Sequence, residues 1–193
     1  MILWINGEFG SGKTTCAFEL NRRLPDSFVY DPENIGYFLQ RNTPVSKNDF
    51  QDYEEWRVFN LALLRRINSE FSGTIIVPMT VVEPRYFDEL IRPLIDELGA
   101  RHFILYASRE TLLKRLNRRL ERGNTWAKAR IDRCVSAFDS VIVGEKIITD
   151  NLTIDAVVEE IAKRSGLELA PDTRSVTRKK FDRAVTLIKH IRR

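Results

Sequence analysis

The chain of 193 residues contains few of the residue types that staple small secreted proteins or bind metals. It has two cysteines, Cys16 and Cys134, and two histidines, His102 and His190. Two cysteines exclude a disulfide framework and indicate a reducing compartment, so we expect a cytoplasmic protein. The spacing of these four residues fits neither a metal site nor a catalytic triad, and we predict that all four are structural.

Long apolar segments are also missing. No apolar run approaches the length needed to cross a bilayer, and residues 1–6 lack the basic segment and long apolar core of a secretory signal. Hydrophobic residues make up 43% and charged residues 30% of the chain, which excludes collagen-like and disordered classes. The length allows one sizeable domain, or one domain with a small appendage.

The net charge of +4 is unevenly distributed along the sequence. Residues 109–133 carry a net charge of +6 and residues 174–193 a net charge of +7, which leaves −9 for the rest. The chain is therefore an acidic body with two basic segments, and each segment needs its own explanation. The C-terminal segment lacks the interleaved exposed aromatics of single-strand binders, so nucleic acid is disfavoured as a partner.

Short apolar runs alternate with helical patterns along the chain. The runs typical of buried strands lie at 2–5, 28–30, 74–77, 102–106 and 146–149. Helical patterns occupy most of 34–71, and then 84–98, 109–122, 125–138, 155–164 and 176–192. This alternation predicts an α/β fold with a five-stranded parallel sheet between helical layers. We expect one domain over residues 1–166, followed by a linker and a basic amphipathic helix over 167–193.

The first apolar run leads directly into the sequence G-x-x-x-x-G-K-T at residues 7–14. Backbone N–H groups of such a loop surround phosphate oxygens, and the next helix turns its positive end toward the same anion. A chance match is expected in under ~1% of chains of this length. The sequence therefore predicts a three-layer P-loop NTPase fold that binds ATP. Its nucleotide-binding residues are predicted to be Gly7, Gly10, Ser11, Gly12, Lys13, Thr14 and Thr15.

Three side chains of this loop have individual predictions. Lys13 supplies a mobile charge for the β- and γ-phosphates and is a candidate catalytic residue. The hydroxyl of Thr14 is a candidate ligand of Mg²⁺. Glu8 is an uncommon acid in such a loop, and we expect it to face outward.

Asp31 and Glu33 follow the second predicted strand, which in this fold ends beside the phosphate loop. A carboxylate there can accept the proton of an acceptor hydroxyl or ligate Mg²⁺, so Asp31 is a candidate base and metal ligand. Glu33 is a candidate substrate contact. Asp31 can equally close an Asx-type turn before a helix, and the spacing does not separate the two interpretations. Thr80, after the third strand, can contact phosphate or substrate, or be a turn residue.

The segment 109–133 begins as an amphipathic helix with a stripe of leucines. Arginines spread the negative charge that develops in phosphoryl transfer, so we expect this segment to act as a lid over the phosphates. Most of its arginines are predicted to form a solvated surface. Those predicted to reach the phosphates are Arg118 and Arg119 as catalytic residues, Arg122 as a nucleotide ligand, and then Arg130 and Arg133.

Residues 34–71 form a helical insert rich in aromatic side chains. This region covers the acceptor in small-molecule kinases, so an aromatic lining suits a hydrophobic or ring-containing acceptor. Core packing explains most of these aromatics, but Tyr53 and Trp56 are candidates for substrate contact. Residues 149–151, after the fifth strand, either approach the nucleotide base or form a turn with a helix cap.

The C-terminal helix places apolar residues on one face and basic residues on the other. Such a helix can lie in the interface of an anionic membrane, as a peripheral contact on its inner face. It can also pack its apolar stripe on the body or dock on another subunit, which allows a homodimer. The sequence leaves these three interpretations open.

Several stretches together resemble the tunicamycin-resistance protein family of P-loop ATP-binding proteins. They are W-I-N-G-x-F-G-S-G-K-T, V-Y-D-P-E, I-V-P-M-T and A-S-x-E-T-L-L-K-R-L, followed by I-D-R-C-V, T-D-N-L and x-H-I-R near the end. The layout is more distantly similar to chloramphenicol phosphotransferase and shikimate kinase. The resemblance implies ATP binding, resistance to a uridine-containing nucleoside antibiotic and a C-terminal helix that touches the membrane. The family's loop residues correspond to Gly7, Gly12, Lys13 and Thr14, and its base to Asp31 by position only.

Two functional hypotheses follow. The first is a kinase that uses ATP·Mg²⁺ to phosphorylate a hydroxyl of a nucleoside-like small molecule. The second is an ATP-dependent protein that sequesters the drug at the membrane without turnover. An RNA-binding ATPase is a weaker third interpretation, which requires an affinity that falls steeply with salt.

Overall fold

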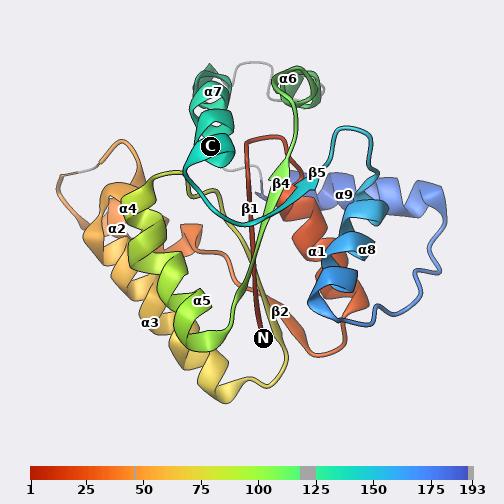
Figure 1. The fold of residues 1–193 in the computed structure, drawn as a ribbon, viewed down its shortest axis with the longest axis horizontal. Coiled ribbons are helices and arrows are strands. Elements are labelled where there is room, and N and C mark those ends of the chain that lie inside the picture. The colour runs from red at the N-terminus through yellow and green to blue at the C-terminus, as the bar shows by residue number, and fades with distance from the viewer. Residues whose placement is uncertain (46, 118–124, 191–193) are drawn as a thin grey trace.

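The computed structural model describes residues 1–45, 47–117 and 125–190 (Figure 1). Its centre is a five-stranded parallel sheet in the order β2-β3-β1-β4-β5. The strands are β1 (Ile2–Gly7), β2 (Ser27–Val29), β3 (Thr74–Pro78), β4 (Arg101–Tyr106) and β5 (Glu145–Ile148). The five predicted strands and their parallel arrangement are confirmed.

Strand β1 lies in the middle of the sheet and is buried on both sides. Ile2 and Trp4 belong to the apolar core on one face, whereas Leu3 and Ile5 belong to the core on the other. All four side chains are fully buried. A parallel strand that is covered by helices on both faces requires such a continuous apolar run, which is why the sequence identifies it.

Helices cover both faces of the sheet and give the fold three layers (Figure 1). One face carries α2 (Glu33–Asn42), α3 (Glu54–Glu70), α4 (Pro84–Tyr86) and α5 (Arg92–Leu98), with a 3₁₀ turn η1 (Phe50–Asp52) before α3. The other face carries α1 (Lys13–Arg23), α8 (Ile154–Ser165) and α9 (Val176–His190). Beyond the carboxyl ends of the strands lie α6 (Arg109–Asn117) and α7 (Thr125–Ser140).

The helical segment at 84–98 contains a wide turn. A π-helical turn, η2 (Phe87–Ile91), joins α4 to α5 immediately before Pro93. Proline cannot donate a backbone hydrogen bond and its ring crowds the preceding turn, so a local widening lets the helix continue past it.

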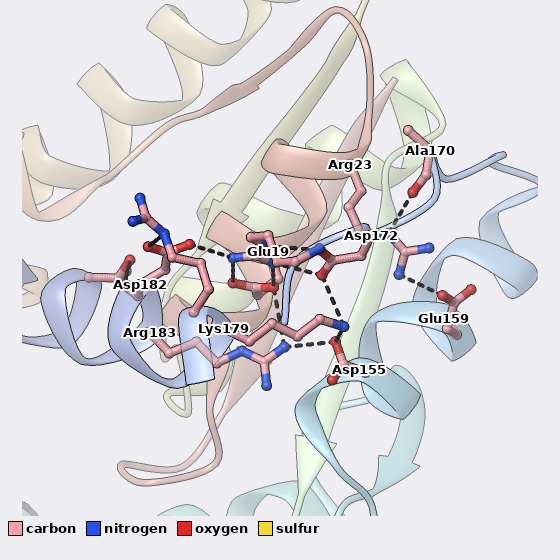
Figure 2. Close-up of polar contacts among 12 residues, drawn as sticks. Glu19, Arg23, Asp155, Glu159, Ala170, Asp172, Lys179, Asp182 and Arg183 are labelled. Atoms are coloured by element: carbon pink, nitrogen blue, oxygen red, sulfur yellow. Dashed lines mark hydrogen bonds and ion pairs between the residues drawn. The ribbon is translucent and has the colours of Figure 1, made fainter. Parts of the chain in front are cut away.

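The C-terminal helix α9 packs across α1 with its charged side turned inward (Figures 1 and 2). The side chains of Lys179, Asp182 and Arg183 are only 19%, 10% and 18% exposed. By contrast, Phe181 and Ile188 are 61% and 60% exposed. The helix therefore packs on the body through ion pairs, and not through its apolar stripe. Within the described ranges, no helix combines the length and apolar character that crossing a membrane requires.

Candidate functional site

The glycine-rich loop joins the end of β1 to the start of α1. Gly7, Gly10 and Gly12 all have positive φ, at 146°, 91° and 102°. A Cβ atom on Gly7 would lie 2.6 Å from the carbonyl oxygen of Leu105, so no larger residue fits there. The sequence adopts this loop because glycine alone combines these dihedrals with such close backbone contact.

The loop has the groups that a nucleotide phosphate requires. Gly12 is the N-cap of α1 and no side chain caps this helix, so its first N–H groups point toward the loop. The buried hydroxyl of Ser11 has no hydrogen-bond partner among the described residues. The Nζ atom of Lys13 donates to the carbonyl oxygens of Gly7 and Glu8 at 3.0 and 2.9 Å. The N–H groups at the start of α1 and the ammonium group of Lys13 are donors of the kind that binds an anion.

Glu8 does not face outward as expected. Its side chain is fully buried, and its carboxylate has no side-chain hydrogen-bond partner in the part of the chain that the structure describes; the polar groups that approach it are the backbone N–H groups of Glu8 and Ala107. Burial raises the pKa of Glu8 to about 7, although the positive charge of Lys13 opposes part of this shift. The phosphate loop therefore contains a carboxyl group that is poised between its neutral and ionised forms near neutral pH.

Polar side chains at the ends of β1 and β3 support the loop. The buried hydroxyl of Thr80 donates to the carbonyl oxygen of Gly7 at 2.8 Å. Asn6 accepts from the N–H groups of Gly7 and Val81, both at 2.9 Å. Thr80 also lines the cavity described below, so it is placed both to hold the loop and to contact a ligand.

Asp31 and Glu33 lie together where the chain leaves β2. The backbone N–H of Glu33 donates to Oδ1 of Asp31 at 3.0 Å, which closes the predicted turn before α2. The hydroxyl of Tyr37 donates to Oε2 of Glu33 at 3.1 Å. Both carboxylates also line a cavity of about 190 Å³ together with Thr14. Asp31 therefore closes the turn and lines the cavity at the same time, so its two interpretations do not exclude each other. Thr14 and Asp31 both offer oxygen atoms at this cavity, which is the ligand type that Mg²⁺ prefers in proteins.

A larger cavity of about 460 Å³ extends from the loop over the insert. Lys13 and Thr14 line it at the loop, and Tyr37 and Phe50 supply aromatic walls. Carboxylates and amides also line it, namely Glu33, Gln40, Asn48, Asp49, Gln51, Asp52 and Glu83. The cavity therefore offers hydrogen bonds and ring faces, and is more polar than the aromatic composition of the insert suggests.

Tyr53 and Trp56 do not reach this cavity. They are 4% and 0% exposed, and their side chains belong to the apolar core. The hydroxyl of Tyr53 donates to the carbonyl oxygen of Val45 at 3.0 Å. The indole N–H of Trp56 donates to the carbonyl oxygen of Pro32 at 2.9 Å. Trp56 thus supports the turn between Asp31 and Glu33 from behind, which is a positioning contact, and not the expected substrate contact.

The structure places two of the predicted arginines at the site. Arg130 lies 2.5 Å from Oδ2 of Asp49, and Arg133 lies 2.8 Å from Oε2 of Glu83. Both arginines line the large cavity, and their ion pairs connect α7 to the opposite wall. Arg118, Arg119 and Arg122 fall outside the described residues.

The turn after β5 has a capping role. The carboxylate of Asp150 accepts hydrogen bonds from the backbone N–H of Ser108 at 3.1 Å and from the hydroxyl of Thr111 at 2.7 Å. Thr149 accepts from Arg115 through its hydroxyl and its carbonyl oxygen. These contacts attach α6 to the turn after β5, whereas the helix that follows this turn, α8, is capped by Thr153, whose hydroxyl accepts from the backbone N–H of Ala156.

His190 is a site residue that sequence reasoning missed. It lines both cavities, next to Thr14, Asp31 and Glu33. The other histidine, His102, is buried between Asn6 and the carbonyl oxygen of Val143, and burial lowers its pKa to about 4. Spacing gave no signal for His190 because its neighbours in the site come from the opposite end of the chain.

The strand order, the glycine-rich loop and the carboxylates after β2 define a protein with the P-loop kinase fold. No protein-family model and no curated protein sequence matches the chain. The chain is, however, similar to the solved tunicamycin resistance protein of Deinococcus radiodurans. The identity is 35% and the TM-score 0.76, over 89% of this chain and 98% of that one. The chain therefore belongs to the tunicamycin resistance protein family, as the sequence motifs predict.

Two kinases share the fold at lower identity. The shikimate kinase of Bacteroides thetaiotaomicron is 16% identical with a TM-score of 0.57, over 86% of this chain and 99% of that one. A gluconokinase from Sinorhizobium meliloti 1021 is also 16% identical, with a TM-score of 0.53 over 82% and 87% of the two chains. These similarities confirm the predicted three-layer fold of the shikimate-kinase type.

Proposed function

We propose that this protein is an ATP-dependent kinase that phosphorylates a hydroxyl group of a nucleoside-like antibiotic or a related metabolite. One observation carries this proposal: the two carboxylates after β2 line two cavities that they share with residues of the phosphate loop. Lys13, Thr14 and Glu33 line the larger cavity, with Asp31 in the smaller cavity shared with Thr14. A phosphoryl donor and a hydroxyl acceptor can therefore meet there in line.

In this proposal each group of the loop has one task. The N–H groups at the start of α1 and the Nζ atom of Lys13 bind the phosphates. Thr14 and Asp31 hold Mg²⁺, which neutralises charge on the β- and γ-phosphates when bound. Asp31 also accepts the proton of the acceptor hydroxyl. Arg130 and Arg133 line the cavity on the side of α7, where they can contact phosphate oxygens.

The lining of the large cavity indicates the chemistry of the acceptor. Carboxylates and amides bind sugar hydroxyls, whereas Tyr37 and Phe50 provide faces for a ring. A molecule with both hydroxyl groups and a planar base satisfies this lining. The Deinococcus relative is named for resistance to tunicamycin, and we propose that the acceptor of this chain belongs to the same class.

The decisive experiment is mass spectrometry of tunicamycin and of uridine after incubation with protein, ATP and Mg²⁺. We expect an added phosphoryl group in wild type. For Asp31→Asn we expect a product rate lower by roughly 10²-fold or more, because the base is lost. Recovery of unmodified tunicamycin that binds more tightly with ATP would instead favour sequestration without turnover. No binding and no product would contradict both.

We further propose that α9 makes reversible contact with an anionic membrane surface while the protein remains cytoplasmic. Phe181 and Ile188 expose 61% and 60% of their surface on the outward side of the helix. The exposed basic residues Arg178 and Lys189 flank this stripe. Exposed apolar side chains beside basic ones are the pattern of helices that lie in the membrane interface.

A further inference from the structure

The outer side of helix α3 carries an exposed apolar patch. The helix lies at the outer margin of its layer (Figure 1), and its side that contains Trp56 packs in the core. On the opposite side, four apolar residues recur at the spacing of one helix face, namely Val58, Phe59, Ala62 and Leu63. The three larger side chains expose 53%, 43% and 39% of their surface. Apolar side chains that gather on one exposed face are typical of a contact with another molecule.

Opposite charges flank this patch along the helix. Glu55 lies about one turn before the patch and Arg66 about one turn after it, and both are exposed. Arg66 pairs with Glu70 of the same helix, but the two side chains are 70% and 57% exposed, so this pair is weak and can be exchanged for another. We call Glu55, Arg66 and the four apolar residues between them the α3 face.

The α3 face is complementary to itself. In an antiparallel pair of helices related by a two-fold axis, each residue lies at the level of the residue that is equally far from the axis in the other direction. With the axis midway between positions 60 and 61, Glu55 lies at the level of Arg66 of a second copy. Phe59 lies at the level of Ala62, whose small side chain leaves room for the ring. Each charged or bulky group of the face thus meets a suitable group of the other copy.

We propose that two copies of this chain associate through the α3 face as a two-fold symmetric dimer. Such a dimer forms two charge pairs and one central apolar contact from a single surface. Helix α3 has 17 residues and is about 26 Å long, so the contact is small and we expect a dissociation constant on the order of micromolar.

The charges distinguish this surface from the outward stripe of α9. That stripe is flanked by Arg178 and Lys189, which would place like charges against each other if two copies met there. The α3 face carries one charge of each sign at its ends, so it offers no net attraction to an anionic membrane. A second copy of the chain satisfies both of its charges.

Charge reversal tests the proposal with the full chain. Sedimentation velocity of wild type between about 1 and 200 µM should show the conversion of monomer to dimer. Glu55→Arg places like charges opposite each other at both ends of the contact, and so does Arg66→Glu. Each variant alone should therefore have a dissociation constant about tenfold higher or more. Circular dichroism should show that both variants remain folded, because both substituted residues are exposed.

A mixture of the two variants provides the sharpest control. Glu55→Arg and Arg66→Glu present opposite charges to each other at both ends, so a heterodimer should form with an affinity close to that of wild type. Native mass spectrometry distinguishes it from both homodimers by mass. Glu168→Arg, which makes the same change of charge at an exposed position between α8 and α9, should dimerise like wild type.

Three results would overturn the proposal. The first is a wild type that stays monomeric up to about 200 µM. The second is dimerisation that both reversal variants retain, because the contact would then lie on another face. The third is a mixture of the two variants that fails to form the heterodimer. None of these measurements uses ATP or an acceptor, so they do not depend on the kinase function proposed above.

Discussion

Glu8 places a carboxyl group inside a loop whose other groups favour anions. Its pKa is raised to about 7, mainly because the side chain is buried. An ionised Glu8 would repel a phosphate bound to the same loop, whereas the neutral form would not. The protonation of this single residue is therefore coupled both to folding and to the proposed binding of ATP.

The sign of the folding effect follows from proton uptake. The unfolded glutamate has a pKa of about 4.5, so between about pH 4.5 and 7 the folded state binds more protons than the unfolded state. The contribution of Glu8 to stability must then fall as the pH rises through this range, whereas that of His102, whose pKa burial lowers to about 4, rises up to about pH 6.5. Glu8→Gln should remove the contribution of Glu8 and stabilise the protein at pH 8 by on the order of 3 kcal/mol. Urea unfolding of wild type and Glu8→Gln at pH 5 and pH 8 measures the free energy of unfolding from which both effects follow.

Two comparisons complete this prediction. The exposed residue Glu168 provides the control variant Glu168→Gln, which should keep the slope of wild type. ATP affinity, measured by calorimetry, should weaken for wild type as the pH rises from about 6 to 8 and stay level for Glu8→Gln. A parallel decline in both proteins would show that Glu8 is not the responsible group.

Other residues show where sequence reasoning ends. Gly7 was predictable as a loop residue because its dihedral and its contact with Leu105 require glycine. The position of Trp56 in the apolar core was not predictable, because the spacing of residues on a helix does not reveal which side faces the core. The inward direction of the Glu8 side chain was also not predictable from the sequence. It depends on the path of the loop and on how closely the loop lies to β4.

At the scale of elements, α9 has an orientation that a helical wheel cannot supply. The wheel separates its apolar and basic faces correctly, but says nothing of which face packs inward. Glu19 on α1 decides this, because a buried carboxylate requires positive partners, and the half-exposed Asp155 on α8 adds a second partner for Arg183. Both residues are distant from α9 in the sequence, so the choice becomes visible only in the structure.

The outward stripe of α9 leads to a prediction about membranes. The double variant Phe181→Ser/Ile188→Ser should bind phosphatidylserine vesicles at least about tenfold more weakly than wild type, since each buried apolar side chain contributes ~1.5–3 kcal/mol. Co-sedimentation with vesicles measures the loss. Phe28→Ser/Val143→Ser, at exposed apolar residues outside α9, should bind like wild type. Equal binding of all three proteins would argue against contact through α9.

At the scale of the whole molecule, the positive charge of the tail is partly neutralised by carboxylates of the body that it covers. Glu19 of α1 accepts from Arg174 and Arg183, and the Arg174 guanidinium holds the pKa of the Asp172 carboxyl well below its usual range. Ion pairs within the molecule thus compensate part of the strong positive charge of residues 174–193. Composition could reveal the excess charge of the tail, but not that its partners lie on α1 and α8.

Ion pairs among Glu19, Asp155, Asp172, Arg174, Lys179, Asp182 and Arg183 hold the tail on the body. Removing one of these charges should release the tail. Glu19→Gln leaves two arginines facing an uncharged, buried side chain, which typically costs about 3–5 kcal/mol. We expect faster cleavage by trypsin after residues 174–183 and a lower melting temperature. Glu159→Gln is the control, because Glu159 pairs with Arg23 but is 57% exposed and should matter little. Similar cleavage of both variants would contradict a tail held by buried charges.

The inverted packing of α9 also has a calorimetric consequence. Unfolding a core raises the heat capacity because water must hydrate newly exposed apolar surface, whereas exposing polar groups lowers it. Detachment of α9 uncovers mainly carboxylates, guanidiniums and an ammonium group, while Phe181 and Ile188 are already in contact with water. The enthalpy of detachment should therefore stay nearly constant over a temperature range in which the unfolding enthalpy of the sheet changes steeply.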